Sequence, residues 1–478
     1  MSTPDVWREH YRETPSLLAS LPEVGPVVSA FNANVDALLR VTPERLNTWL
    51  QPFDAGFVLA EGPPEIREPV DVLRGLVTCL RRGVAAEWLV ANPDVDRWMR
   101  DTLGQDGTQM GGQAGIIGNV LAVAGLPVLV HAASNPPQQA QLFADLKNLQ
   151  TVGPDGTLTP ARLAGREHDT AMVHLILEFQ KGDTFTVGEE TFTCPRSNRF
   201  IATYDPLNCG LAIEPEFAAA VESYPQPISA VVLSGYQMLT ETLADGRSGL
   251  AQVNASRAVL ERWRASHPKS IIHLEVASTQ DLEVRRAMVE QIVPVCDSLG
   301  CNEQELAQIL ESLGDAERAA TVSADLHGVT LTAALIDVFQ RLGVERIQLH
   351  FFGMYLTVQK PAARLAPEAN RAGMALAATL AAAKAGTGSL EDPASFLWAH
   401  GNDVSPLPLQ ELEDIAGYLE STYGQTDFAR TGIFFGDTFD LIAMPTILVE
   451  KPVSLVGMGD TISALSLIGT LAASRRNP

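Results

Sequence analysis

Short apolar runs alternate along the chain with segments in which apolar residues recur every three or four positions. The apolar runs occupy residues 27–31, 127–131, 230–234, 271–275 and 346–350, and the helical patterns occupy 115–124, 248–266, 279–292 and 331–342. Strands that are apolar on both faces are typical of parallel sheets covered by helices on both sides. The pattern therefore predicts an α/β fold whose large domain has a central, mostly parallel sheet flanked by helices.

Two segments interrupt this alternation. Residues 40–108 are rich in Pro and Arg, and residues 168–204 hold alternating apolar runs around Lys181-Gly182-Asp183, a hairpin signal. We interpret the two segments together as a smaller, discontinuous lid domain built on a β-sheet. The large domain then comprises residues 1–39, 109–167 and 205–478.

Composition narrows the class of protein. The chain has 478 residues, enough for two domains, and its 57 acidic against 34 basic residues give a net charge of −23. This balance argues against nucleic acid or an anionic membrane as a partner. The five cysteines follow no zinc-site spacing, and no apolar run reaches membrane-spanning length. We expect a cytoplasmic protein with free thiols.

The most informative motif is Gly457-Met458-Gly459-Asp460, which follows a β-branched run and opens a helical pattern. The first amides of a helix lack internal partners and form an anion site. An aspartate there would repel a resting phosphate, so it is better suited to take a hydroxyl proton during phosphoryl transfer. The structural alternative is an ordinary glycine turn with Asp460 as the helix N-cap.

Two other motifs suit a polyhydroxylated ligand. Asn34 and Asp36 follow a predicted strand, where a carboxylate can accept from two vicinal hydroxyls and an amide can both donate and accept. Gly112 and Gln113 open a helix after a second glycine turn, where free amides can hold hydroxyls or phosphate. An Asx-turn cluster and a closely packed helix are the respective alternatives.

Glu275, Asn302 and Glu305 suggest a magnesium site. Mg²⁺ keeps most of its waters, so proteins often hold it through carboxylates that bond those waters. His273 and Glu275 point the same way if 271–275 is a strand. A helix capping box of Asn302 and Glu305 is the alternative, and both interpretations can hold together.

Taken in order, several runs resemble the ADP-dependent glucokinase/phosphofructokinase family of the ribokinase-like superfamily. They lie at 32–36 (NANVD), 111–116 (GGQAGI), 198–202, 233–237, 273–278, 300–305 (GCNEQE) and 456–461 (VGMGDT). The resemblance runs from about residue 30 to about residue 467. It implies a large α/β domain with a lid that closes over a sugar, and transfer of phosphate from ADP with Mg²⁺ and release of AMP.

The resemblance also implies roles for individual residues. Asp460 would be the base, Gly457 and Gly459 would line the anion hole, and Arg199 would contact the phosphate. The remaining implied roles are sugar contacts by Asn34, Asp36, Gly112 and Gln113, nucleotide contacts by His350, Tyr355 and Val449, and a magnesium network of Glu275, Glu305 and Asp460 with Asn302 beside it. The implied protein is a monomer or small homo-oligomer.

The resemblance implies that one lid residue, four positions after a glycine, distinguishes the sugar substrates of this family. Glucose users carry Glu at that position, and strict phosphofructokinases carry a small residue. Here Glu87 follows Gly83, and a carboxylate suits glucose because it accepts from a hydroxyl and would sit badly beside a sugar phosphate. Glu87 therefore favours a glucokinase. An exposed lid-helix glutamate paired with Arg81 and Arg82 is the structural alternative. Lys181 or Arg166 could still serve a phosphate, so a phosphofructokinase or a bifunctional enzyme stays open, as does, more remotely, a non-catalytic sugar- or nucleotide-binding regulator.

Overall fold

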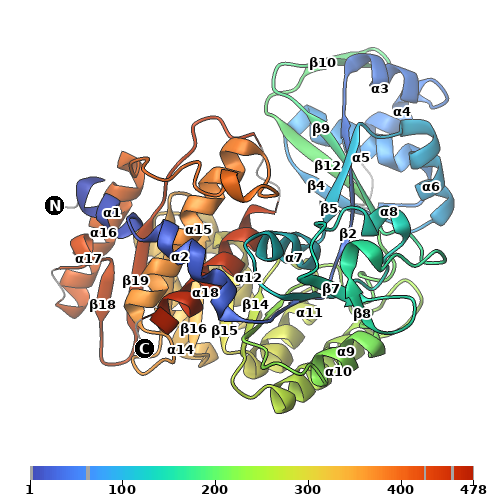
Figure 1. Cartoon of the computed structure of the whole chain (residues 1–478). Helices are drawn as coiled ribbons and strands as arrows, with labels where there is room; N and C mark the ends of the chain where they lie inside the picture. The colour runs from blue at the N-terminus through green and yellow to red at the C-terminus, as the bar shows by residue number, and fades with distance from the viewer. Residues whose placement is uncertain (1–3, 61–64, 425–426, 454–456, 477–478) are drawn as a thin grey trace.

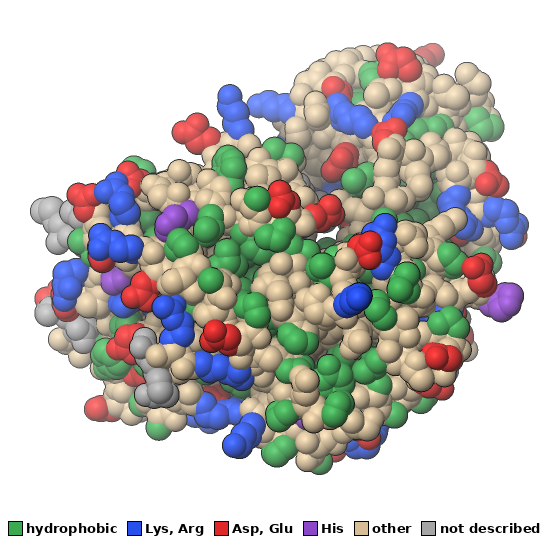
Figure 2. Space-filling view, in the orientation of Figure 1, with side chains coloured by type: hydrophobic (Ala, Val, Ile, Leu, Met, Phe, Trp, Pro, Cys, Tyr) green, Lys and Arg blue, Asp and Glu red, His purple; other side chains and the backbone are tan. Residues whose placement is uncertain are grey.

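The computed structural model describes residues 4–60, 65–424, 427–453 and 457–476. The chain forms two units, each built on its own sheet, and Figure 1 shows the smaller unit at the upper right of the larger one. On the face drawn in Figure 2 a notch separates the two units, and acidic and basic side chains are interspersed over the surface.

The large unit contains an eleven-stranded sheet in the order β18-β19-β17-β16-β15-β14-β13-β1-β6-β7-β8. Its central strands are parallel: β1 (Val27–Ala30), β6 (Val128–Val130), β7 (Leu149–Val152), β13 (Ala230–Leu233), β14 (Ile271–Glu275), β15 (Ser298–Cys301) and β16 (Arg346–Phe351). The antiparallel strands at its margins are β8 (Leu158–Pro160), β17 (Met354–Gln359), β18 (Ile433–Phe435) and β19 (Asp440–Pro445). The central, mostly parallel sheet is confirmed.

Helices cover both faces of this sheet (Figure 1). One face carries α7 (Gln113–Val123), α15 (Pro367–Thr387) and α18 (Met458–Arg476), with α1 (Pro4–Tyr11) and α2 (Thr14–Ser20) outside them. The other carries α9 (Pro215–Glu222), α10 (Gly249–Ser266), α11 (Leu282–Ala287), α12 (Glu303–Ser312), α13 (Ala316–Ala324), α14 (Gly328–Leu342) and α16 (Pro406–Tyr423). Two single turns, α8 (Pro137–Ala140) and α17 (Phe428–Thr431), complete the unit. No helix among the described residues has both the length and the hydropathy needed to cross a membrane.

The small unit contains a six-stranded sheet in the order β3-β4-β12-β9-β2-β5. The strands are β2 (Asn34–Arg40), β3 (Glu65–Ile66), β4 (Ala86–Val90), β5 (Gly107–Gly111), β9 (Val173–Phe179) and β12 (Asn198–Tyr204). The helices α3 (Pro43–Leu50), α4 (Ala55–Leu59), α5 (Pro69–Arg82) and α6 (Pro93–Trp98) pack with one face of it into a separate hydrophobic core. A hairpin of β10 (Thr184–Val187) and β11 (Glu190–Thr193) extends the unit.

Two details differ from the sequence-based expectation. The small sheet already begins at Asn34 and includes β5 up to Gly111, because β2 pairs with both β9 and β5. The hairpin turn lies at Gly188 rather than at Lys181-Gly182-Asp183, since β10 pairs with β11 and not with β9. The assignment of this unit as a lid stays a prediction.

The small sheet has one apolar and one polar face. Side chains alternate along a strand, so Ala37, Leu175 and Phe200 point into the helix-covered core. The opposite face carries the side chains of Asp36, Glu87, His174 and Thr203, which we call the polar face.

Candidate active site

Asp460 lies in the first turn of α18, directly after a glycine turn. Gly457 adopts the left-handed conformation with φ +60°, which glycine tolerates without the penalty of a side chain. Gln113, the first residue of α7, donates from Nε2 to Asp460 Oδ1 at 2.5 Å. Burial raises the pKa of Asp460 above its ordinary value, while Gln113 and the nearby Lys384 act against that rise. A carboxylate made more basic in this way is suited to accept a proton.

Gln113 is itself fixed by Ser234, whose hydroxyl donates to its Oε1. The end of β13 and the start of α7 therefore orient the side chain that touches Asp460. The sequence places Ser234 at the end of an apolar run, but its partner could not be known until the fold brought residue 113 beside it.

Gly459 lies against two of the predicted nucleotide and metal residues. A Cβ on Gly459 would stand 2.9 Å from His350 Nε2 and 3.8 Å from Glu275 Oε1, so only glycine leaves this space open. His350 Nε2 is 4.0 Å from Glu275 Oε1. Burial lowers the pKa of His350 to about 4, so its imidazole is neutral. Tyr355 lies directly opposite His350 in the β16–β17 pair, and both are buried.

Glu275 and Glu305 are buried carboxylates: Glu275 ends β14, and Glu305 lies in the first turn of α12, which follows the neighbouring strand β15. Burial raises the pKa of Glu305 to about 8, and Asp460 adds to that rise. Burial, followed by repulsion from Glu305, holds the pKa of Glu275 well above its ordinary value. Asp460 also raises the pKa of Glu275, so the three carboxylates lie close enough to repel one another.

The capping box predicted as the alternative for 302–305 is present. Asn302 accepts from the backbone of Glu305 at 3.0 Å, and Glu305 accepts from the backbone of Asn302 at 2.8 Å. Within the described part of the chain, no three His, Cys, Asp or Glu side chains are grouped to ligate a metal directly. The Oε2 atom of Glu275 is buried and has no hydrogen-bond partner among the described residues. This oxygen lies 3.6 Å from His273 Nε2, and its free acceptor capacity beside repelling carboxylates fits a hydrated Mg²⁺ held through its waters.

The predicted sugar motifs meet where β2, β5 and α7 converge. Asn34 donates from Nδ2 to Asp36 Oδ1 at 2.9 Å. Gly112 caps α7 with φ +70°, and a Cβ there would stand 2.6 Å from the backbone oxygen of Asn32. Asn34 Oδ1 is buried with no partner among the described residues, which leaves an acceptor for a ligand.

Glu87 belongs to the polar face, not to a lid helix. It lies on β4, accepts from Thr203 Oγ1 at 2.7 Å and lies 3.8 Å from His174 Nδ1. Arg81, one of the charge partners expected for an exposed glutamate, is paired instead with Glu190 at 2.8 Å. The polar face therefore brings Glu87 to the same side of the sheet as Asp36.

Sequence reasoning missed His174. It lies on β9 opposite Asp36 on β2 and Thr203 on β12, and its Nε2 is 3.0 Å from Asp205 Oδ2. Burial disfavours its charge, but Asp205, Glu87 and Asp36 raise the pKa of His174 to about 9. Its place in the alternating run 172–179 could have suggested the polar side of that strand, but not three acidic neighbours.

No hydrogen bond or ion pair in the described part of the chain joins Arg199 or Val449 to the other site residues. Arg199 lies on β12 opposite Glu178 of β9, toward the hairpin end of the small sheet. Val449 follows β19 and packs against the large core. Their predicted roles with phosphate and adenine stay predictions, and Val456 of the 456–461 motif lies outside the described residues.

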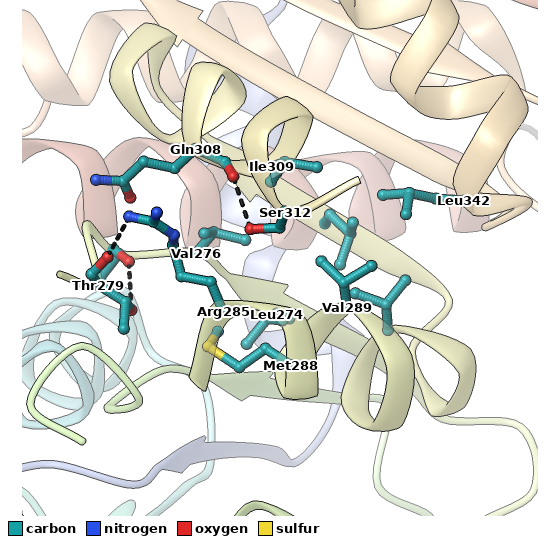
Figure 3. Close-up of a pocket in the computed structure, with 13 residues that line it drawn as sticks. Leu274, Val276, Thr279, Arg285, Met288, Val289, Gln308, Ile309, Ser312 and Leu342 are labelled. Carbon is teal, nitrogen blue, oxygen red and sulfur yellow. Dashed lines mark hydrogen bonds between the residues drawn. The ribbon is translucent and has the colours of Figure 1, made fainter. Parts of the chain in front are cut away.

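An apolar pocket lies on the other side of β14 (Figure 3). Leu274 and Val276 line it with Met288 and Ile309, and Arg285 donates to the backbone oxygen of Thr279 at 2.8 Å. Because neighbouring side chains of a strand point to opposite faces, Leu274 points away from His273 and Glu275. None of the predicted site residues lines this pocket.

Comparison with known proteins identifies the family to which the chain belongs. Residues 25–469 match the model of the ADP-specific phosphofructokinase/glucokinase conserved region. The chain belongs to this family. It is an ADP-dependent hexose kinase, so ADP is its co-substrate, and the non-catalytic regulator is no longer needed as an explanation.

Relatives within this ADP-dependent kinase family carry both sugar names. The ADP-specific phosphofructokinase of Methanosarcina acetivorans is 31% identical and covers 95% of this chain and 94% of its own length. The ADP-dependent glucose/glucosamine kinase of Pyrococcus furiosus is 30% identical, covering 97% of this chain and 98% of its own.

Solved structures of the family superpose over nearly the whole kinase. A last common ancestor of ADP-dependent phosphofructokinases from Methanosarcinales has a TM-score of 0.86 at 30% identity, covering 98% of this chain and 99% of that one. An ADP-dependent kinase complex with fructose-6-phosphate and ADPβS has a TM-score of 0.83 at 29% identity, covering 98% of each.

Proposed function

We propose that this ADP-dependent kinase phosphorylates glucose in preference to fructose 6-phosphate. The observation that carries the proposal is the position of Glu87 on the polar face, beside His174 and on the same side of the sheet as Asp36. A carboxylate there accepts a hydrogen bond from a sugar hydroxyl, and it repels a sugar phosphate.

In the proposed reaction Asp460 takes the proton of the sugar hydroxyl as the phosphoryl group arrives. Gln113 holds the carboxylate in place through its 2.5 Å hydrogen bond. The first amides of α18, beside Gly457 and Gly459, receive the negative charge of the transferred group. AMP leaves once the sugar phosphate has formed.

Mg²⁺ would supply charge neutralisation to the phosphates of ADP when it is bound. Glu275 and Glu305 are the residues that would hold its water ligands, and Asp460 would be the third carboxylate of this group. Asn302 keeps Glu305 in place through the capping box. His350, neutral and buried beside Gly459, is placed to contact the nucleotide without adding charge.

A phosphofructokinase or bifunctional enzyme is the second candidate, because relatives at similar identity carry the phosphofructokinase name. Of the two cations considered for a sugar 6-phosphate, Arg166 is fully engaged with Asp169 at 2.6 Å and Glu214 at 3.0 Å. Lys181 lies in the exposed turn that connects β9 to the hairpin, at the end of β9 remote from His174. Neither supports a phosphate pocket on the polar face.

The variant Glu87→Ala tests the choice of sugar. Loss of a charged hydrogen bond to a sugar hydroxyl should cost about 1.5–3 kcal/mol, so kcat/KM for glucose should fall roughly 10- to 150-fold. Efficiency with fructose 6-phosphate should stay level or rise, because a repulsive charge has gone. Initial rates with both sugars and ADP measure the effect.

The variant Glu190→Ala is a matched control, since the side chains of Glu190 and Glu87 are each 39% exposed and only Glu87 lies on the polar face. It should leave both efficiencies unchanged. An equal loss on both sugars in Glu87→Ala would reduce Glu87 to a structural part of the small sheet and remove the argument for glucose.

A further inference from the structure

A lysine is buried under the glycine turn that precedes Asp460. Lys384 lies near the end of α15, within a stretch of the helix made almost entirely of buried Ala and Leu, and is 7% exposed. A charged side chain in such surroundings is costly unless its hydrogen bonds are made. Its partners therefore indicate what the charge is for.

The ammonium group of Lys384 makes its hydrogen bonds to the turn itself. Nζ donates to the backbone oxygen of Gly457 at 3.0 Å and to Thr461 Oγ1 at 3.0 Å. Thr461 Oγ1 donates to the same Gly457 oxygen at 2.7 Å. No carboxylate lies within ion-pair distance of Lys384 in the described part of the chain. The lysine is held by a carbonyl and a hydroxyl, not by a counter-ion.

The position of this contact has an electronic consequence. The Gly457 carbonyl and the Met458 amide belong to one peptide group, and Met458 is the first residue of α18. A cation on the oxygen of a peptide polarises the group and makes its N–H a stronger donor, because linked hydrogen bonds strengthen one another at low dielectric. That N–H is one of the free amides at the start of the helix, where an anion binds.

We propose that Lys384 is a positioning residue for the transferred phosphoryl group, acting through the Gly457–Met458 peptide. Its hydrogen bond to the Gly457 oxygen holds the glycine turn in its left-handed conformation. Its positive charge lies at the oxygen end of the peptide whose N–H faces the anion site. The inference rests on the proposed role of this turn in receiving the phosphoryl group. Nothing in the sequence motifs pointed to residue 384, which lies in an Ala-rich helix far from the glycine turn in sequence.

The charge state of the lysine is consistent with this role. Burial lowers the pKa of Lys384 to about 8, and the nearby Asp460 opposes that fall. The ammonium form therefore predominates at neutral pH.

The variant Lys384→Met tests the inference, since it keeps the length of the side chain and removes its charge and donors. We expect kcat to fall roughly 10- to 100-fold, less than the roughly 10²- to 10³-fold that follows loss of an anion-hole donor itself. KM for the sugar should change little. By calorimetry, affinity for ADP should fall at least several-fold while affinity for AMP, which lacks the transferable phosphate, stays the same.

The matched control is Thr379→Val on the same helix, where a buried hydroxyl donates to the backbone oxygen of Ala375 and to no other described residue. It should leave kcat and both nucleotide affinities unchanged. If Lys384→Met does not fold, Thr461→Val removes the other side chain that clamps the Gly457 oxygen and should also weaken ADP binding more than AMP binding. Equal loss of ADP and AMP affinity, or unchanged kcat in folded Lys384→Met, would overturn the proposal. A parent protein that phosphorylates fructose 6-phosphate in preference to glucose would instead contradict the proposed function and leave this inference standing.

Discussion

His174 is the cation among the acidic residues of the polar face. Asp205, Glu87 and Asp36 surround it, and together they keep its imidazole charged. The charged ring can hold Glu87 with its second oxygen free for a sugar hydroxyl. The proposed preference of Glu87 for glucose therefore depends on His174, which lies outside the sequence motif at 83–87.

The stabilising effect of His174 should depend on pH in a definite direction. Its pKa rises from 6.5 to about 9 on folding, so its contribution is full below pH 6.5 and is lost as pH rises through about 9. The difference in free energy of unfolding between the parent and His174→Gln should therefore be larger at about pH 6 than at about pH 9.5. Urea unfolding at both pH values measures it. His168→Gln, at an exposed position, is the control, and a difference for His174→Gln that stays constant or grows with pH would contradict this account.

Individual elements explain why parts of the site were predictable. The polar ends of β14 and β16 could be predicted from the sequence, because a His or Glu at or next to the end of an apolar parallel strand lies at the carboxyl edge of the sheet, where ligands bind. The turn before α18 was predictable because Gly457 and Gly459 stand between a β-branched run and a helical pattern. The contacts of Gln113 with Ser234 and of Lys384 with Gly457 were not, because they join elements far apart in sequence.

The capping box of α12 offers a clean test of the magnesium network. In Glu305→Gln the side-chain oxygen can still accept from the Asn302 amide, so the cap is kept while the charge is lost. The Mg²⁺ concentration for half-maximal rate should rise roughly 10- to 100-fold, as for other groups that order metal-bound ligands, and Glu275→Gln should act alike. Glu311→Gln on the same helix is the control, because Glu311 pairs with Arg285 instead. Magnesium titrations that match the parent in both variants would leave the cap as the only role of this pair.

At the scale of the whole molecule, the predicted site residues are divided between the two units. The large unit carries Glu275 and His350 on its sheet and Asp460 on α18, whereas the small sheet carries Asp36, Glu87 and Arg199. The alternation of strands and helices was enough to predict the large sheet. The small sheet was harder to delimit, because β2 follows directly on β1 and β5 leads directly into α7, and both β1 and α7 belong to the large unit.

Arg199 and Asp460 both have predicted roles at the phosphate, and no hydrogen bond or ion pair in the described part of the chain joins them. We therefore expect the small unit to close over the large one when both substrates bind, since transfer in open solvent would lose phosphate to water. Small-angle scattering should show a smaller radius of gyration with glucose and a non-hydrolysable ADP analogue than without ligand. AMP alone is the control and should give less compaction. An unchanged radius under saturating ligands would rule out a closing lid.

The most direct test of the account is the variant Asp460→Asn, measured for turnover and for ADP binding in the same preparation. Asparagine keeps the shape of the side chain and cannot take a proton, so kcat should fall by about 10²- to 10⁴-fold. The dissociation constant for ADP should stay within a few-fold of the parent value, because the base acts only as the hydroxyl proton leaves. A variant that retains kcat within a few-fold of the parent would remove Asp460 from the reaction and contradict the mechanism built around it.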